Sequence, residues 1–481
     1  MLCPNLKPEL STPLYQQLYA YIKEEIHLGH LTPGSKLPSK RSLANFLNIS
    51  LNTVTDAYNQ LVDEGYLKSL ERKGYFVENF DLLYKPKDRP KEWDQEEKRK
   101  KVTYDFSFNT IDEGLFPYSL WRKAYREAVE KGTDFLNDPD PQGGWSLRQE
   151  IAHYLYSSRG VNVHPSQIVI SAGTEFLFFL INQMVSPQSI FAVENPGYER
   201  LSHIFKAGDQ KFTPIGLDRW GMRTDLLEES GASIACVTPS HQFPTGCIMP
   251  LSRRQDLLAW AGKAPGRYIV EDDYDSEFRY SGRPIPSLKS MDVGDRVIYM
   301  GSFSKSISPS LRISYMVLPQ NLKEEYLEKL TVFKCPVSAA SQRALEIFIQ
   351  KGDFEKHLNR MRNHYRRKRE TLVQALKEAF PQAKIGGEEA GLHLLLYLDK
   401  KLPEKDLVDY LQEKSFALRG LYEFRLDKLT SPKPCLVLGF GRLLEEDIEK
   451  SVLALKEAIL DFKEDLWKRK EGEAYLFWSW P

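Results

Sequence analysis

The sequence lacks the features of membrane, secreted and metal-binding proteins. No segment approaches the roughly 20 apolar residues that span a bilayer, and the first residues show no basic stretch followed by an apolar run, so neither a membrane span nor a secretory signal is expected. Only five of the 481 residues are cysteines, and they form no C-x-x-C pair. We therefore expect no disulfide framework, no metal site and a cytoplasmic location.

An excess of either charge is also missing. The 66 basic and 66 acidic residues give a formal net charge of zero, so bulk charge favours neither nucleic acid nor acidic ligands. The length of 481 residues predicts more than one domain. Composition breaks at 85–101, which holds two prolines and almost no apolar residues. We predict a linker at 81–104 between a head at 11–80 and a body at 105–481.

Apolar spacing in the head predicts three helices and a hairpin. The first helix repeats apolar residues every four positions, the second spans 41–47, and the third follows Ser50, which is a good N-cap. After Gly65, residues 66–67 and 74–77 predict two strands. The side chains expected in the core are Leu14, Leu18, Ile22, Ile26, Leu43, Ala44, Phe46, Leu47, Val54, Ala57, Tyr58 and Leu61. Three helices and a hairpin predict a winged helix-turn-helix.

Such a fold reads double-stranded DNA with its third helix. Polar Asn52, Thr53 and Thr55 at the start of that helix are expected to meet base edges. The predicted phosphate contacts, which position the protein without reading sequence, are Lys40, Arg41, Arg72 and Lys73. Residues 1–80 carry eight basic and eight acidic side chains, so binding requires the cations on one face and two heads per operator. A helical module that binds protein is the alternative.

Two sequence motifs of the head also indicate a DNA-binding domain. Residues 36–67, KLPSKRSLANFLNISLNTVTDAYNQLVDEGYL, and 71–77, ERKGYFV, resemble the GntR family of DNA-binding regulators. The match runs over roughly 11–80. Leu51 stands where the family usually has an arginine, which removes one DNA contact or shifts operator preference.

The body alternates strand-like and helix-like segments. Apolar runs at 168–170, 190–193, 234–237, 268–270 and 297–300 predict an α/β domain with a mainly parallel sheet. The aromatic C-terminal segment, residues 473–481, is expected to pack on the body or on a partner subunit.

Three motifs follow these strands. The motif SAGTE at 171–175 has small residues that suit a phosphate at a helix N-terminus. The acidic run at 271–274 can supply a carboxylate to a pyridine nitrogen, although a capping or metal-binding turn is the simpler interpretation of that run alone. Lys305, in the third motif at 301–305, is a candidate for imine formation in a sheltered site. Ser302, Ser304 and Arg312 can bind phosphate.

Together these motifs resemble the fold-type-I, aspartate-aminotransferase-like enzymes that bind pyridoxal 5′-phosphate (PLP). The resemblance implies that Lys305 forms the internal aldimine, that Asp272 pairs with the ring nitrogen and Tyr274 with the ring oxygen, and that Tyr198 stacks on the ring. It also implies a phosphate site made of Gly173, Thr174, Ser302 and Arg312. Phe243 stands where these enzymes have an asparagine, so efficient transamination is not expected.

The phrases SHQFPTG at 240–246 and EDDYDSEF at 271–278 resemble the MocR group of PLP-binding GntR regulators, and its GABA-responsive members in particular. This implies a homodimer with each head over the partner's body, and an effector carboxylate bound by Arg442 and Arg200. The hypothesis is a regulator that senses an amino-acid-like effector through an external aldimine. The alternatives are a regulator of vitamin B6 synthesis that senses PLP, an active aminotransferase with an accessory head, and a sensor of D-alanyl-D-alanine or another amino compound.

Overall fold

The chain forms two compact units, Met1–Arg99 and Lys100–Pro481. The computed structural model describes residues 4, 6, 7, 12–79, 102–108, 110–131, 139–280, 285–398, 402–427 and 434–477, with side chains up to residue 468. Most of the predicted linker, and the side chains of the aromatic C-terminal segment, lie outside the described residues. The predicted domain boundaries therefore stay predictions.

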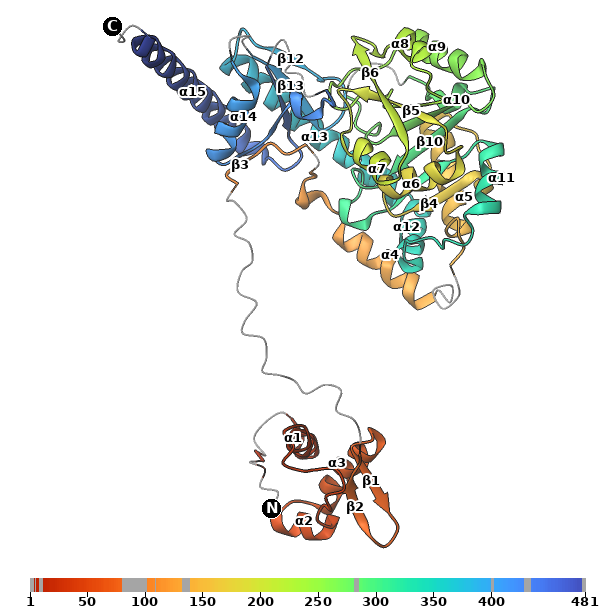
Figure 1. The fold of residues 1–481 in the computed structure, drawn as a ribbon, viewed down its shortest axis with the longest axis vertical. Coiled ribbons are helices and arrows are strands. Elements are labelled where there is room, and N and C mark those ends of the chain that lie inside the picture. Colours follow the sequence, from red (N-terminus) through yellow and green to blue (C-terminus); the bar gives the residue numbers. More distant parts are fainter. Residues whose placement is uncertain are drawn as a thin grey trace. The chain divides into compact units, whose positions relative to one another are not determined.

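The first unit has the predicted winged-helix architecture (Figure 1). It contains α1 (Leu14–His27), α2 (Lys40–Leu47), α3 (Leu51–Asp63) and an antiparallel hairpin of β1 (Leu67–Leu70) and β2 (Gly74–Val77). Ser50 caps α3 by accepting a 3.0 Å hydrogen bond from the Thr53 amide. The core contains most of the predicted side chains, but the prediction for Phe46 was wrong. Its side chain is 49% exposed because Leu43 and Ala44 form the inner face of the short α2.

The second unit is built on an eight-stranded sheet in the order β4-β11-β10-β9-β8-β5-β6-β7. Five neighbouring strands, β10, β9, β8, β5 and β6, are parallel, while β11 and β7 are antiparallel to their neighbours. Each strand predicted for the body falls within an observed one, which confirms the mainly parallel α/β body. The strands are β4 (Ile168–Ser171), β5 (Ile190–Asn195), β6 (Lys211–Asp218), β7 (Gly221–Met222), β8 (Ile234–Val237), β9 (Tyr268–Asp273), β10 (Val297–Ser302) and β11 (Ser314–Val317).

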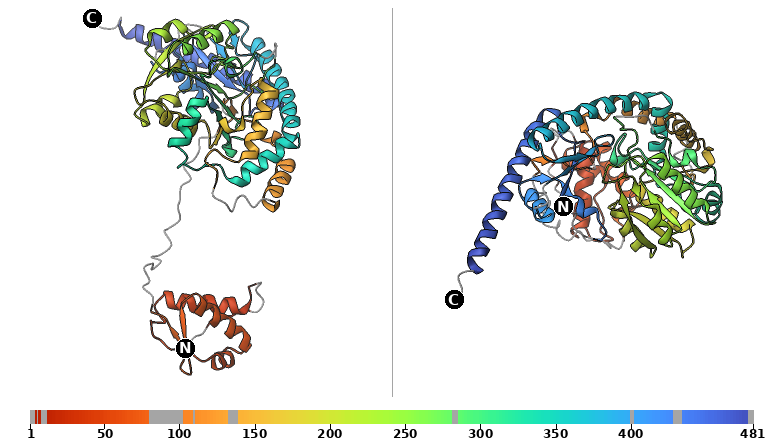
Figure 2. Two further views of the ribbon diagram at one scale, coloured as in Figure 1. Left: turned by 90° about the vertical axis from the view of Figure 1, so that its right-hand side faces the viewer. Right: turned by 90° about the horizontal axis from the view of Figure 1, so that it is seen from above.

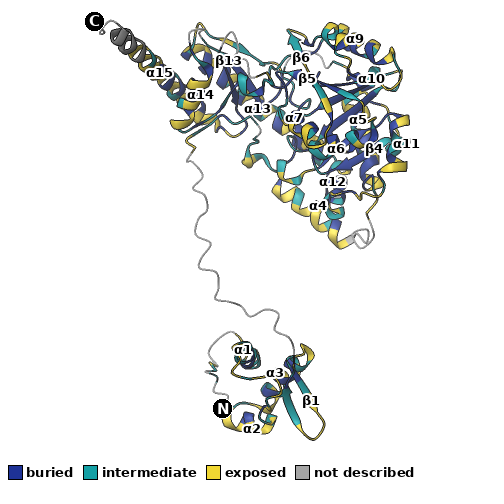
Figure 3. Cartoon of the chain, in the orientation of Figure 1, coloured by how far each residue is buried: buried dark blue, intermediate teal, exposed yellow. Residues whose placement is uncertain are grey.

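Helices cover both faces of this sheet, and its strands are largely buried (Figure 3). Apolar side chains of the strands pack into clusters on both faces. On one face, Met300 and Met316 pack with residues of α6 (Thr174–Met184), α7 (Arg200–Ala207) and α11 (Gln320–Lys329). On the other face, strand residues including Tyr299 and Ile269 pack with four helices and the segments between them. These helices are α4 (Tyr118–Lys131), α5 (Trp145–Arg159), α9 (Leu251–Gly262) and α12 (Ala339–Gln350). Two short helices, α8 (Thr224–Glu229) and α10 (Leu288–Met291), complete this layer.

A smaller lobe follows the large one. Its antiparallel sheet has the order β12-β13-β16-β15, and β3 pairs with β14. The long helix α13 (Asp353–Ala379) joins the lobes, since its first turns pack in the core of the large lobe and its later turns in that of the small one (Figure 2). The other elements are β3 (Tyr104–Asp105), β12 (Lys384–Gly386), β13 (His393–Tyr397), α14 (Glu404–Glu413), β14 (Phe416–Ala417), β15 (Arg419–Gly420), β16 (Cys435–Gly439) and α15 (Ile448–Phe477). Among the helices within the described residues, none has the length and apolar character needed to cross a membrane.

Candidate cofactor and DNA-binding sites

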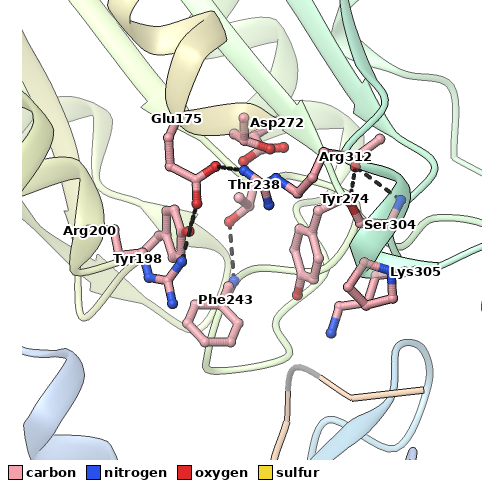
Figure 4. Close-up of a pocket in the computed structure, with 13 residues that line it drawn as sticks. Glu175, Tyr198, Arg200, Thr238, Phe243, Asp272, Tyr274, Ser304, Lys305 and Arg312 are labelled. Atoms are coloured by element: carbon pink, nitrogen blue, oxygen red, sulfur yellow. Dashed lines mark hydrogen bonds and ion pairs between the residues drawn. The ribbon is translucent and has the colours of Figure 1, made fainter. Parts of the chain in front are cut away.

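A cavity lies at the carboxyl ends of the parallel strands, where α/β sheets place their ligands. Sequence segments more than 100 residues apart meet there (Figure 4). The predicted cofactor residues line the cavity except for Gly173, which directly precedes the lining residue Thr174, and Arg200 lines it as well. The full lining is Thr174, Glu175, Tyr198, Arg200, Thr238, Phe243, Asp272, Tyr274, Ser302, Ser304, Lys305, Pro309 and Arg312.

Lys305 follows β10 and projects into this cavity. Its Nζ donates a 2.9 Å hydrogen bond to the backbone carbonyl of Phe108. Burial disfavours the charged amine and lowers the Lys305 pKa to about 8, although the negative charge of Asp275 works in the opposite direction. A lysine with this pKa is neutral in about a tenth of the molecules at pH 7, far more than an ordinary lysine, and the neutral amine is the nucleophile that attacks an aldehyde.

Asp272 lies near the end of β9, beside β10 in the register Met300↔Asp272. Burial raises its pKa to about 7, and the nearby carboxylates of Asp273 and Asp275 add to the shift. No described residue donates a hydrogen bond to the Asp272 side chain. A carboxylate in this position is suited to a cationic partner, and the protonated nitrogen of a pyridine ring is one.

Tyr274 lies next to a buried histidine–aspartate pair that the sequence analysis did not single out. The Tyr274 Oη lies 3.0 Å from His241 Nδ1, which in turn lies 2.8 Å from Asp275 Oδ2. The side chains of His241 and Asp275 are only 1% and 3% exposed. Because this pair orients the tyrosine hydroxyl, it fixes the group predicted to meet the ring oxygen. Both residues belong to motifs used above, but the contact joins segments 34 positions apart.

The predicted phosphate residues converge at one end of the cavity. The Ser302 hydroxyl donates to Ser304 Oγ at 2.9 Å and accepts from Ser314 Oγ at 3.0 Å. Gly173 has φ of +94°, and a Cβ there would lie 2.0 Å from Nη2 of Arg312. Only glycine therefore allows the arginine to lie across the start of α6, where backbone amides and the helix dipole favour an anion.

Aromatic rings form another wall of the cavity. Tyr198 and Phe243 meet edge to face with 6.3 Å between ring centroids. Phe243 is held from behind, since its backbone amide donates to Thr238 Oγ1 at 3.1 Å. In place of the polar asparagine of aminotransferases, this position contributes an apolar ring that also packs on Phe424 at 5.1 Å.

The two predicted effector arginines have different surroundings. Arg200 lines the cavity and forms a 3.1 Å ion pair with Glu175. Arg442 is not among the residues that line the cavity. Its guanidinium lies 3.0 Å from Glu113 and 3.6 Å from Asp105, so an effector carboxylate would have to replace these partners.

The predicted DNA-binding residues of the head are spread over α2, α3 and the hairpin tip. Arg41, Asn52, Arg72 and Lys73 are exposed. Lys40 is instead half-buried, and its Nζ donates to Asn59 Oδ1 at 3.2 Å and lies 5.1 Å from the centre of the Tyr75 ring. Thr53 and Thr55 are half-buried, and the Thr53 hydroxyl lies 2.8 Å from Ser50 Oγ. Of the three residues predicted to meet base edges, Asn52 is thus the exposed one.

Comparison with known proteins supports the division into two parts. Residues 14–77 match the family model for bacterial regulatory proteins of the gntR family, and residues 104–436 match that for aminotransferase class I and II. A solved structure of Pyrococcus horikoshii kynurenine aminotransferase superposes with a TM-score of 0.68 at 26% identity, covering 75% of this chain and 92% of that one.

Curated relatives match along nearly the whole chain. The uncharacterized HTH-type transcriptional regulator YdeL of Bacillus subtilis (strain 168) is 40% identical, over 95% of this chain and 98% of the relative. The HTH-type pyridoxine biosynthesis transcriptional regulator PdxR of Corynebacterium glutamicum is 33% identical, over 94% and 98%. The probable rhizopine catabolism regulatory protein MocR of Rhizobium meliloti is 29% identical, over 95% of each. The chain therefore belongs to the MocR group of GntR-family transcription regulators, which join a winged-helix DNA-binding domain to a fold-type-I aminotransferase-like body.

Proposed function

We propose that this chain is a PLP-dependent DNA-binding regulator that senses an amino-acid-like effector. The observation that carries the proposal is the meeting of Lys305 and Asp272 in one cavity, with pKa values moved to about 8 and about 7 by burial. These pKa shifts suit Lys305 to act as a nucleophilic amine and Asp272 to bind a cationic group of a ligand.

The residues of the cavity fit PLP. Arg312, Ser302, Ser304 and the amides beside Gly173 would hold the phosphate, Asp272 would bind the ring nitrogen, and the hydroxyl of Tyr274 would face the ring oxygen. When bound, the cofactor supplies an aldehyde that combines reversibly with amines. Lys305 would attach to it covalently, and the amine of an effector would compete for that attachment.

The effector carboxylate would bind Arg200, which already lines the cavity, and Arg442 after release from Glu113 and Asp105. Regulation follows if effector and DNA prefer different arrangements of a homodimer. A second candidate function, a sensor of PLP itself in the control of vitamin B6 synthesis, is favoured by the likeness to the pyridoxine biosynthesis regulator. Steady aminotransferase turnover is disfavoured by Phe243.

Operator binding by the full-length chain tests these functions against one another. DNA sites are first selected from a random pool, and affinity is then measured without PLP, with PLP, and with PLP plus a panel of amino acids. We expect a change in affinity on adding an amino acid to the PLP-loaded protein, and no change with the matching amine that lacks a carboxylate. A response to PLP alone would favour the vitamin B6 function. If neither PLP nor any amino acid changes the DNA affinity, both the effector-sensing function and the PLP-sensing function are contradicted.

A further inference from the structure

Glu175 joins the proposed cofactor and effector arginines. It lies in the first turn of α6, and its carboxylate receives a 2.6 Å contact from Nη2 of Arg312 through one oxygen and a 3.1 Å contact from Nη1 of Arg200 through the other (Figure 4). The Tyr198 hydroxyl lies 3.5 Å from the second oxygen. Within the described residues, Glu175 is the acidic partner of both guanidinium groups.

The position of this carboxylate is the one expected for a phosphate. It lies at the N-terminus of an 11-residue helix and contacts Arg312, the arginine that passes over Gly173. Glu175 lines the same cavity as Ser302 and Ser304. Although burial opposes ionisation, hydrogen bonds from the Glu175 amide, Arg312 and Arg200 lower the Glu175 pKa. The group is therefore an anion at neutral pH and occupies hydrogen bonds that a phosphate would use.

We propose that Glu175 is a built-in competitor for both ligands, opposing the cofactor phosphate at Arg312 and the effector carboxylate at Arg200. This inference rests on the proposed function. A phosphate that reaches Arg312 meets the like charge of Glu175, so the glutamate has to release that arginine. The side chain is 32% exposed, which leaves it room to move, and it retains Arg200 as a partner.

The consequence is a link between the two binding events. With phosphate on Arg312, the charge of Glu175 is balanced by Arg200 alone, and an effector carboxylate then has to compete for that arginine. Glu175 thus weakens PLP binding. It also lowers the affinity of an effector, because the effector carboxylate has to displace Glu175 from Arg200. The competing charge comes from one side chain, so one substitution tests it.

The test compares PLP with pyridoxal, which lacks the phosphate, in equilibrium titrations followed by visible absorbance. In Glu175→Gln we expect PLP affinity to rise by up to about fivefold, the upper range for a partly exposed ion pair, with pyridoxal affinity unchanged. Glu175→Asp keeps the charge and should bind PLP nearly as the wild type does. Glu228→Gln, which removes an exposed carboxylate paired with Lys263 and Arg267, is the matched control and should change neither affinity.

Each outcome decides the proposal. If the wild type binds PLP and Glu175→Gln binds it no more tightly, the competition is refuted while the PLP site stands. An equal gain for pyridoxal would also refute it, because the effect would not depend on the phosphate. If PLP binds neither the wild type nor Glu175→Gln, the proposed function fails as well. Circular dichroism spectra that match the wild type establish that the variants are folded.

Discussion

The head and the body place their predicted functional residues in opposite environments. In the head, Arg41, Asn52 and Arg72 are exposed around a small apolar core. In the body, Lys305 and Asp272 lie in a cavity where burial shifts their pKa values to about 8 and about 7. Contacts made from an exposed surface are expected to contribute small, separable amounts to binding, whereas groups in a shared cavity act together.

The largest effect is expected at Lys305. Lys305→Ala removes the amine that would attach to the cofactor, so the visible absorbance of the bound cofactor should disappear completely. Lys263→Ala, which removes an exposed lysine paired with Glu228, should leave the spectrum unchanged. A Lys305→Ala protein with the wild-type spectrum would show that the body does not use this residue.

Gly173→Ala tests the approach of Arg312 to α6. The added Cβ would lie 2.0 Å from the guanidinium, and φ of +94° is unfavourable for alanine. We expect the protein to lose about 1–3 kcal/mol of stability and PLP to bind at least about tenfold more weakly, since a charge-assisted hydrogen bond contributes about 1.5–3 kcal/mol. Gly262→Ala is the control, because its Cβ would meet no atom within 4 Å. Equal PLP affinity in the two variants would remove Arg312 from the phosphate site.

Asp272→Asn tests the buried carboxylate through pH. The folded protein raises the pKa from 3.8 to about 7, so it binds a proton more tightly than the unfolded chain, and stability falls as pH rises from about 4 to 7. One pKa unit corresponds to about 1.4 kcal/mol, so the asparagine variant without cofactor should be up to about 4 kcal/mol more stable than the wild type at pH 8, and equal to it near pH 4. Thermal unfolding at several pH values measures this, and saturating PLP should reverse the order at pH 8. A variant less stable at pH 8 without PLP would contradict the assignment.

Arg72→Ala tests the exposed cations of the head. Arg72 is at the hairpin tip, so its loss should weaken binding to all DNA sequences by a few-fold and reduce the salt dependence of log K by about one. Fluorescence anisotropy over a salt series on two unrelated DNA duplexes measures both. Lys68→Ala removes a cation of the same hairpin that is already paired with Glu78 at 3.0 Å, and it should have little effect. A loss confined to one sequence would assign Arg72 to base readout.

The smallest effect is expected for Lys40→Ala. Because Lys40 contacts Asn59 and the ring of Tyr75, we expect a loss of about 0.5–1 kcal/mol in stability of the head. We expect less change in DNA affinity than for Arg41→Ala. Chemical unfolding and the same anisotropy assay compare the two variants. A larger DNA defect in Lys40→Ala would show that Lys40 leaves its partners to meet a phosphate.

Local sequence patterns were enough to predict the helices and strands. The contacts between side chains far apart in the sequence could be identified only from the fold. Each apolar run lies within an observed strand, and Ser50 caps α3 as its position before the helix indicated. Phe46 was misplaced because the short α2 buries a narrower face than its composition suggests. The pairing of Arg442 with Glu113 joins residues 329 positions apart. That of Glu175 with Arg312 joins residues 137 apart, and no local periodicity encodes such contacts.

The most direct measurement is chemical trapping of the covalent bond to the cofactor. The full-length protein is incubated with PLP, reduced with borohydride, digested and mapped by mass spectrometry. We expect a pyridoxyl label on the peptide that contains Lys305, and its loss when PLP is omitted. A label spread over exposed lysines, or absent from Lys305, would show that this cavity does not bind the cofactor through that amine.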